Sequence, residues 1–312
     1  MKSSYFAINR LEFIVTYRCT GACHHCSLGD QLNRPGSVAP DPDLMADAVR
    51  QLAALTELSS VMTFGGEPLL YPDVTAAIHR AARDCGIPQR QLITNGFFSR
   101  DEDKINAVAA NLAEAGVNDL LLSVDTFHQR TIPLEPVRQF AEALIRHQVP
   151  TRLQPAWLVT ESAENAYNDE TRGILGEFAP LHLPVGQGND IFLSGNAIRY
   201  LADYYPPPQM DPEDRCGRMP YTDPLDHITS LSVEPDGAVT VCGFTLGNLH
   251  DASMAEIMEN YDPYANPLMH ALLTGGVPEL LALAKAQGIA VHPESCHSIC
   301  DLCRQVRIGM KD

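Results

Sequence analysis

The stretch that decides the fold is residues 12–26, EFIVTYRCTGACHHC. Its first five residues, EFIVT, are rich in β-branched and aromatic side chains and predict a buried strand. Cys19, Cys23 and Cys26 follow that strand directly. In parallel β/α folds, the loops that leave the carboxyl ends of the strands carry the ligand-binding groups. We therefore expect the three cysteines to lie at the functional edge of a sheet.

The spacing of these cysteines suits two kinds of metal site. Three thiolates from one loop can bind three irons of a 4Fe–4S cluster, and without a fourth neighbouring cysteine the fourth iron has no protein ligand. Such an open iron is a reaction site. Alternatively, the thiolates form a structural zinc site with His24 or His25 as fourth ligand, or they are separate core residues. The triplet alone leaves these alternatives open.

Apolar β-rich runs alternate with helical segments up to about residue 190. The runs that predict strands are EFIVT (12–16), VMTF (61–64), QLIT (91–94), LLLSV (120–124), RLQ (152–154) and LHLPV (181–185). Asp73 and Asp101 lie where helices are expected to begin, and Gly86 and Gly116 lie where helices are expected to end. Strands that alternate with helices require a parallel sheet with right-handed crossovers. The pattern predicts an α/β fold, a partial (β/α)6 TIM-like barrel over residues 1–190.

Polar or glycine-rich motifs also follow the next three predicted strands. They are Gly65-Gly66-Glu67-Pro68, Asn95-Gly96 and Ser123-Val124-Asp125. Paired glycines let the backbone approach a ligand and present carbonyl acceptors to an ammonium group, and Glu67 adds a negative charge. Each motif alone also fits a tight turn or a helix cap. Their succession on neighbouring strand ends favours one shared ligand cavity.

The pattern Cys-x3-Cys-x2-Cys after the first strand, with Gly-Gly-Glu-Pro after the second, resembles the radical S-adenosylmethionine (radical SAM) superfamily over about residues 10–190. In that family, S-adenosylmethionine chelates the open iron, and its reductive cleavage yields methionine and a 5′-deoxyadenosyl radical that abstracts hydrogen from a substrate C–H bond. The resemblance implies that Cys19, Cys23 and Cys26 bind the cluster. It also implies a cosubstrate site, with Gly65, Gly66, Glu67 and Pro68 at the methionyl amino group and Thr94, Asn95, Ser123 and Asp125 along the ribose and methionine region.

One position departs from the family pattern. The residue before the last cysteine of the triplet is commonly an aromatic that touches adenine, and here it is His25, whose ring can serve in the same way. Polar residues at strand ends that are candidates to face the substrate are Tyr17, His128 and Gln154. For His128, a hydrated entry to the helix near Pro133 explains the sequence equally well. The sequence assigns no catalytic residue on the substrate side.

After about residue 190 the pattern changes. A Pro-rich stretch, YYPPPQMDPEDRC (204–216), precedes a hairpin predicted from ITSLSV (228–233), a turn at 234–237 and AVTVC (238–242). Short helices broken at Gly275-Gly276 lead to a cysteine-rich end. We expect a smaller C-terminal domain of hairpin and helices, α+β in class, over residues 191–312.

This part contains five of the nine cysteines. The segment VEPDGAVTVCGFTLGNL (233–249) resembles the C-terminal extension called SPASM, or its shorter form twitch, which carries auxiliary Fe–S clusters. The full version uses seven cysteines for two clusters, so five thiols leave room for one cluster, expected to be 4Fe–4S, and one spare thiol. The assignment that we favour places that cluster on Cys216, Cys242, Cys300 and Cys303.

The fifth thiol, Cys296, competes for any of these places or serves as a hydrogen donor to a substrate radical. A zinc knuckle of Cys296, Cys300 and Cys303 with His292 or His297 is the alternative. Outside both sets, Cys85 lies on the apolar stripe of a predicted helix, which predicts a buried core thiol.

Composition limits the partners and the compartment. A formal net charge of −17 repels polyanions, so we expect neither nucleic acid nor an anionic membrane surface as a partner. The sequence has no signal peptide and no apolar run long enough for a membrane span, which predicts a cytoplasmic protein. The resemblance further implies a small electron donor, such as flavodoxin or ferredoxin.

Three functions are consistent with these observations. The favoured one is a radical SAM enzyme that modifies a peptide or protein by crosslinking, epimerisation or oxidation, because many relatives with such extensions act on peptides. The second is a small-molecule dehydrogenase in which the auxiliary cluster accepts the electron left after hydrogen abstraction. The third is a non-catalytic Fe–S or zinc protein. The first strand starts near residue 12, which leaves no room for a fused N-terminal leader-binding domain and weighs slightly against the first function.

Overall fold

The computed structural model describes residues 4–34, 38–219 and 222–310. Its main element is an eight-stranded sheet in the order β10-β9-β8-β1-β2-β3-β4-β5. Strands β1 to β5 and β8 run parallel, whereas β9 and β10 are antiparallel to their neighbours. The strands are β1 Phe6–Thr16, β2 Ser60–Gly65, β3 Gln89–Thr94, β4 Asp119–Leu122, β5 Thr151–Leu153, β8 Ile228–Val233, β9 Ala238–Val241 and β10 Phe244–Asn248.

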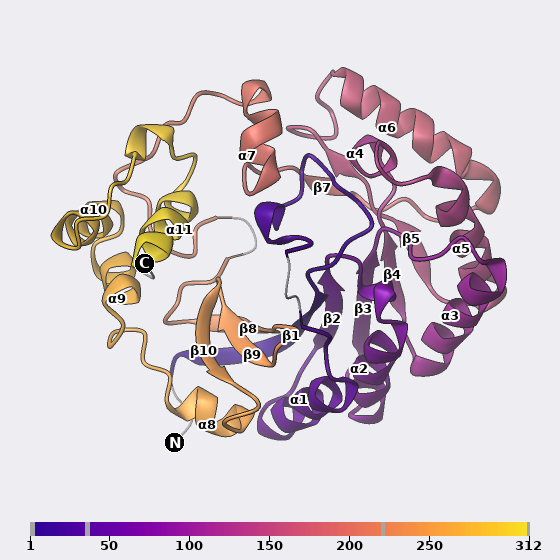
Figure 1. Cartoon of the computed structure of the whole chain (residues 1–312), viewed down its shortest axis with the longest axis horizontal. Helices are drawn as coiled ribbons and strands as arrows, with labels where there is room; N and C mark the ends of the chain where they lie inside the picture. The colour runs from indigo at the N-terminus through magenta and orange to yellow at the C-terminus, as the bar shows by residue number, and fades with distance from the viewer. Residues whose placement is uncertain (1–3, 35–37, 220–221, 311–312) are drawn as a thin grey trace.

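Helices connect the parallel strands and cover the outer face of the curved sheet (Figure 1). They are α1 Pro42–Leu55, α2 Pro72–Asp84, α3 Glu102–Ala115, α4 Thr126–Gln129, α5 Leu134–Arg146 and α6 Ala166–Glu177. One apolar core joins β1, β2, α1 and α2 to the hairpin and the C-terminal helices, and a second lies between β3, β4, α3 and α5. The first core therefore extends across the part of the chain on both sides of residue 190.

The helix ends follow capping chemistry, with two departures from the sequence-based expectations. Asp101 caps α3 by accepting from the backbone N–H groups of residues 103 and 104, and Gly116 ends that helix in the left-handed region. Asp73 does not cap α2; the N-cap is Tyr71, because Pro72 occupies the first helical position and places Asp73 inside the first turn. Cys85 is exposed rather than buried, since it is the C-cap of α2, beyond the packed face of the helix.

The sixth strand expected at LHLPV (181–185) is not a strand. Residues Ala179–Leu181 form a 3₁₀ helix and His182 adopts a left-handed conformation. Only Val185 makes a parallel bridge, to Leu153 at the end of β5. The short strands β6 Ala156–Trp157 and β7 Asn189–Asp190 pair separately. The barrel part therefore has five complete parallel strands and a vestige of the sixth.

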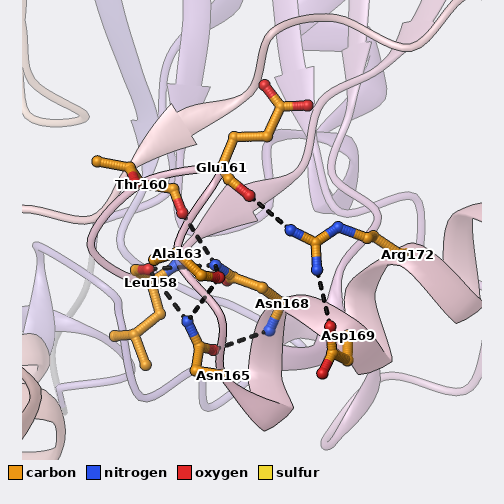
Figure 2. A network of polar contacts seen from close by, with 8 residues as sticks. All are labelled: Leu158, Thr160, Glu161, Ala163, Asn165, Asn168, Asp169 and Arg172. Atoms are coloured by element: carbon orange, nitrogen blue, oxygen red, sulfur yellow. Dashed lines mark hydrogen bonds and ion pairs between the residues drawn. The ribbon is translucent and has the colours of Figure 1, made fainter.

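A buried asparagine fixes the loop between β6 and α6 (Figure 2). The Asn168 carboxamide accepts from the backbone N–H of Leu158 at 2.9 Å and donates to the carbonyls of Thr160 and Ala163 at 2.9 Å each. Asn165 caps α6 by accepting from the backbone N–H of Asn168. The loop thus has its polar backbone satisfied, and it holds the strand that lies beside the carboxyl ends of β4 and β5.

The predicted hairpin forms as β8 and β9, with its turn at residues 234–237, and β10 adds a third strand. Because β8 pairs in parallel with β1, the hairpin continues the main sheet on the side opposite β2. Figure 1 shows these strands beside β1, with the later helices gathered beyond them. Those helices are α8 Met254–Glu259, α9 Pro267–Thr274, α10 Val277–Ala286 and α11 Ile299–Gly309. Helix α7 Asn196–Leu201 precedes the hairpin in the chain and lies beside the first cysteine loop.

The division at residue 190 stays a prediction, since the sheet itself runs through the proposed boundary. The helix break at Gly275-Gly276 is confirmed, because α9 ends at Thr274 and α10 begins at Val277. Among the described residues, none of the helices combines the length and the apolar character that a membrane crossing requires.

Candidate functional site: two thiol sets at one edge of the sheet

The first cysteine loop leaves the carboxyl end of β1 and is held by asparagines. The backbone N–H of Cys19 donates to the Asn33 side chain at 2.9 Å, and that side chain donates back to the Cys19 carbonyl at 3.2 Å. From the segment before α7, the Asn196 backbone N–H donates to the Cys26 carbonyl and its side chain donates to the Cys23 carbonyl. Two segments distant in sequence therefore fix the loop that carries the thiols.

The three thiols of this loop lie near one another. Burial raises the pKa of Cys19 to about 11, and the neighbouring Glu67 and Cys26 raise it further. Burial also raises the pKa of Cys23, to which the charges of Asp125, Cys19 and Cys26 contribute. Uncompensated thiolates are thus disfavoured here, and a bound cationic metal centre is what would stabilise them. The residues fit an iron–sulfur cluster with one iron lacking a protein ligand.

The rings of the two histidines that a zinc site would use pack against other ring side chains. The His24 ring stacks on Tyr200, with centroids 4.2 Å apart. The His25 ring packs against Phe127 and His128, and burial lowers the pKa of His25 to about 4. These contacts favour the cluster over a zinc site at the triplet.

The double glycine after β2 is required by close packing against the first loop. A Cβ on Gly66 would lie 2.1 Å from the Arg18 carbonyl oxygen, and one on Gly65 would lie 2.7 Å from the Thr16 carbonyl oxygen. The Gly66 N–H donates to the Thr16 carbonyl, and the Glu67 N–H donates to the Arg18 carbonyl. The motif therefore joins the second strand end to the cysteine loop, in addition to any role in binding a ligand.

Glu67 is fully buried and its carboxylate joins the ends of β2 and β3. Its oxygens accept from the Leu69 N–H at 2.9 Å, the Thr94 hydroxyl at 2.7 Å and the Asn95 N–H at 2.9 Å. Burial raises the pKa of Glu67 to about 7, although these three donors favour the charged form. Pro68 begins the short 3₁₀ helix that follows. Because its oxygens are used inside the protein, Glu67 positions the neighbouring backbone.

Asn95 approaches the first thiol set directly. Its side-chain N–H groups donate to the Cys19 sulfur at 3.7 Å and to the Thr20 hydroxyl at 3.2 Å. The Gly21 backbone N–H lies 3.4 Å from the same sulfur. Hydrogen bonds to a ligating sulfur tune the reduction potential of a cluster. The sequence placed Asn95 beside the cosubstrate, and the structure adds this contact with the cysteine.

Asp125, His25 and His128 converge at the end of β4, with ligand atoms within 4.8 Å of one another. Asp125 is fully buried and accepts from the His128 N–H, the His128 ring at 2.8 Å and the Ala156 N–H at 3.0 Å. Hydrogen bonds and charge from His128 lower the pKa of Asp125 despite the opposing effect of burial. The Asp125 oxygens are thus committed to His128, which the sequence had grouped with the substrate.

The remaining candidates lie around the same edge. Ser123 is buried at the end of β4, and Gln154 is buried just after β5. Three buried polar atoms in this region have no partner among the described residues, namely His25 Nδ1, Gln129 Nε2 and Gln154 Oε1. Unpaired buried polar atoms are costly, so this edge fits a polar ligand such as S-adenosylmethionine. The structure thus brings His128 and Gln154 beside the predicted cosubstrate residues.

A second thiol set lies where the hairpin meets α11. Burial raises the pKa of Cys242 to about 12, and the charges of Cys216 and Cys300 raise it further. Burial likewise raises the pKa of Cys303 to about 12, where Arg307 opposes and Cys216, Cys300 and Cys242 add to the effect. The four thiols are therefore close enough for their charges to interact, which fits one fully ligated cluster.

Cys296 lies apart from that set. Its sulfur contacts the His292 carbonyl at 3.4 Å and receives a hydrogen bond from Gln305 at 3.2 Å. It is buried in the apolar core. Because its sulfur contacts these groups, we do not count Cys296 among the four thiols of the second set. Its burial also gives no support to the predicted role as a hydrogen donor.

One cavity of about 860 Å³ extends from residues that flank the first cysteine loop to the second thiol set, and Cys19, Cys23 and Cys26 are not among its lining residues. On one side it is lined by Tyr17 and Leu28, which flank the first cysteine loop. On the other side it is lined by all four thiols of the second set, Cys216, Cys242, Cys300 and Cys303. The hairpin supplies further wall through Glu234 and Thr240, residues that the sequence did not single out. Glu234 was missed because the sequence pattern places it in the turn of the predicted hairpin.

These features define an α/β protein with a cysteine triplet at the first strand end of a parallel sheet. Residues 13–154 match the model of the Radical SAM superfamily. The solved structure of hexahistidine-tagged anSMEcpe with bound AdoMet has a TM-score of 0.52 and 16% sequence identity, covering 86% of this chain and 80% of that chain. That family match spans less than half of the chain's 312 residues, and the structural likeness shows the fold alone.

Curated relatives match over part of their length. The GTP 3′,8-cyclase of Moorella thermoacetica is 31% identical over 121 residues, which are 38% of this chain and 35% of that protein. The GTP 3′,8-cyclase of Lactiplantibacillus plantarum is 31% identical over 132 residues, which are 41% of this chain and 38% of that protein. The chain thus spans little more than a third of the length of these relatives.

Proposed function

We propose that this protein is a radical SAM dehydrogenase of a small molecule. Reductive cleavage of S-adenosylmethionine at the first thiol set would give the 5′-deoxyadenosyl radical, which removes hydrogen from a substrate C–H bond. An oxidised Fe–S cluster on the second set would supply an acceptor for the remaining electron. The cofactors of this proposal are therefore S-adenosylmethionine and two clusters, both of 4Fe–4S type.

The observation that carries the proposal is the cavity that extends from the residues flanking the first cysteine loop to the second thiol set. Its volume of about 860 Å³ lies in the range typical of small-molecule sites, roughly 300–1,000 Å³. The four thiols of the second set open on it, as an electron acceptor for a bound substrate must. The two curated relatives described above are named for a small-molecule substrate, GTP.

The residues proposed to hold each group follow from their positions. Cys19, Cys23 and Cys26 would bind the first cluster. The backbone of residues 65–68 would receive the methionyl amino group, because the Glu67 carboxylate is already occupied. His25, His128 and Gln154 would surround the nucleoside part, where the unpaired buried atoms lie. Cys216, Cys242, Cys300 and Cys303 would bind the auxiliary cluster.

This proposal departs from the peptide substrate that the sequence favoured. The comparisons give that preference no support, because the curated relatives are named for GTP. A SPASM or twitch relationship, a flavodoxin or ferredoxin as electron donor, and a cytoplasmic location stay predictions. The third hypothesis, a non-catalytic metal protein, is not favoured, because residues 13–154 match the Radical SAM superfamily model and the curated relatives are named as cyclases.

The proposal is tested with deuterium-labelled cell extract. Reconstituted enzyme, S-adenosylmethionine and reductant are incubated anaerobically with extract separated by size into a small-molecule and a peptide fraction. We expect deuterium in 5′-deoxyadenosine with the small-molecule fraction. GTP is included as a separate arm.

Label that arises only from the peptide fraction would restore the peptide hypothesis. Failure to form 5′-deoxyadenosine under any condition would overturn radical SAM activity itself. A Cys19→Ala variant, which lacks one ligand of the first cluster, serves as the negative control.

A further inference from the structure

Glu234 is a carboxylate in the wall of the cavity, held by two neutral hydroxyl groups. The Tyr17 hydroxyl donates to Glu234 Oε2 at 2.5 Å. The Thr240 hydroxyl donates to Glu234 Oε1 at 3.1 Å. All three residues line the cavity that the four thiols of the second set also line. The carboxylate therefore stands between the end of β1 and the strand that leads to Cys242.

The surroundings of Glu234 make it a stronger base than an exposed glutamate. Burial raises the pKa of Glu234, and the nearby charge of Asp236 adds to that effect, while the two hydroxyl donors oppose it. The Tyr17 hydroxyl acts as a donor to this carboxylate. Oε1 has the longer of the two hydrogen bonds and retains a lone pair for a further donor.

We propose that Glu234 is a catalytic residue, which takes a proton at Oε1 from a hydroxyl or amine group on the substrate carbon that has lost hydrogen. This inference rests on the proposed dehydrogenase function. It narrows the substrate class to small-molecule alcohols and amines. Tyr17 and Thr240 are positioning residues that orient the carboxylate toward the cavity.

The step balances with the groups named above. Removal of a hydrogen atom from a carbon that carries O–H or N–H leaves a carbon-centred radical. Loss of the O–H or N–H proton to Glu234 and of one electron to an oxidised Fe–S cluster gives C=O or C=N. The substrate is thereby oxidised by two electrons, and an imine releases a carbonyl compound and ammonia on hydrolysis. A carbonyl is thus the product expected from either substrate class.

The test compares Glu234→Gln with Glu12→Gln in reconstituted enzyme. Glu12 lines the same cavity, but its carboxylate already pairs with Arg10 at 2.6 Å, so this control removes the same charge. Both variants receive the small-molecule fraction of cell extract, S-adenosylmethionine and reductant. Formation of 5′-deoxyadenosine is measured beside new carbonyl, trapped as a hydrazone. Freeze-quenched samples are examined by electron paramagnetic resonance for an organic radical.

We expect Glu234→Gln to form 5′-deoxyadenosine while its carbonyl yield falls about 100-fold, the low end of the effect of a general base. An organic radical should accumulate in that variant, whereas Glu12→Gln should resemble the wild type. Glu234→Ala should recover carbonyl formation when formate, a small carboxylate base, is added, and sodium chloride should have no effect.

Two results would overturn the inference. One is carbonyl formation by Glu234→Gln equal to that of Glu12→Gln. The other is a parallel loss of 5′-deoxyadenosine and carbonyl without rescue of Glu234→Ala by formate, which would make Glu234 a structural residue. If the wild type forms 5′-deoxyadenosine with the small-molecule fraction but no carbonyl, the dehydrogenase function itself fails. The two failures are therefore distinguishable.

Discussion

At the scale of single residues, the site depends on backbone contacts that leave no room for a side chain. Gly66 lies against the carbonyl of Arg18, one residue before Cys19. The Glu67 N–H donates to that same carbonyl at 2.8 Å. The glycine therefore couples the shape of the second strand end to the shape of the thiol loop. The sequence indicated close backbone approach at this motif, but it did not reveal that the approaching group is the protein itself.

Gly66→Ala should destabilise the protein and loosen the first thiol set. The added Cβ would meet the Arg18 carbonyl oxygen at 2.1 Å, so backbone must move, at a cost of about 3 kcal/mol. Gly173→Ala, on α6 with nothing within 4 Å of its added Cβ, is the matched control and should be neutral or slightly stabilising. Thermal unfolding and iron content measure both effects. Equal behaviour of the two variants would contradict the packing argument.

His79 should give the protein a pH-dependent stability that is independent of the clusters. Burial lowers the pKa of His79 to about 3, and its ring bonds the Thr63 hydroxyl at 2.9 Å. Below the unfolded pKa of about 6.5 only the unfolded chain binds this proton, so the free energy of unfolding falls as the pH falls, by roughly 1.4 kcal/mol per unit. His79→Gln should flatten that slope between about pH 6.5 and pH 5 in urea unfolding. An unchanged slope would contradict the prediction.

At the scale of elements, α11 is joined to the β9–β10 turn by one arginine. Arg307 donates to the Cys242 carbonyl at 2.9 Å, and its guanidinium lies 5.3 Å from the centroid of the Phe244 ring. A Cβ on Gly243 would lie 2.2 Å from that guanidinium, so glycine leaves space for it. The contact made by Arg307 holds Cys300 and Cys303 of α11 near Cys242 of the hairpin.

Arg307→Met should weaken the second thiol set while leaving the first intact. Loss of the arginine removes a contact that orients Cys242, and changes around metal ligands typically cost about 10-fold or more in metal affinity. Arg304→Met, at an exposed position on the same helix, is the control. Iron release to a chelator should be biphasic, with only the second phase accelerated in Arg307→Met. Equal release from both variants would show that the contact is dispensable.

Element boundaries were predictable where local chemistry fixes them. Asp101 caps α3 and Gly116 ends it, because each satisfies backbone groups within its own turn. The prediction of a strand at 181–185 was wrong, because the apolar pattern does not reveal that His182 adopts a left-handed conformation. The prediction that Cys85 is buried was wrong for a related reason. Periodicity placed Cys85 on the apolar face of a helix, although it lies at the helix end.

At the scale of the whole molecule, the sheet brings the second thiol set and residues that flank the first cysteine loop to one cavity. The parallel pairing of β1 with β8 places the hairpin beside the first strand, and Cys242 follows directly from β9. Cys216 lies well before the hairpin, and Cys300 and Cys303 come from α11. Segments from four parts of the chain thus meet in one place.

Counting iron in single cysteine variants tests this assembly. Reconstituted wild type should hold about eight irons, as two 4Fe–4S clusters require. Alanine at Cys216, Cys242, Cys300 or Cys303 should each remove about four of them, whereas Cys296→Ala should retain all of them because Cys296 bonds Gln305 instead. Retention of all iron in every variant would reject the ligand scheme. Loss of iron in Cys296→Ala and in three of the other four variants, with full iron in the remaining one, would exchange Cys296 with that remaining cysteine.

The sequence by itself determined the alternation of strands and helices, the cysteine triplet after β1 and the hairpin, because these depend on neighbouring residues and short spacings. Only the tertiary structure showed that Asp125 is committed to His128, that Cys296 stands apart, and that Glu234 shares a cavity with the thiols. Each of these depends on side chains brought together from distant segments. Burial and hydrogen bonding then decide which polar groups remain available for chemistry, and no local pattern records that outcome.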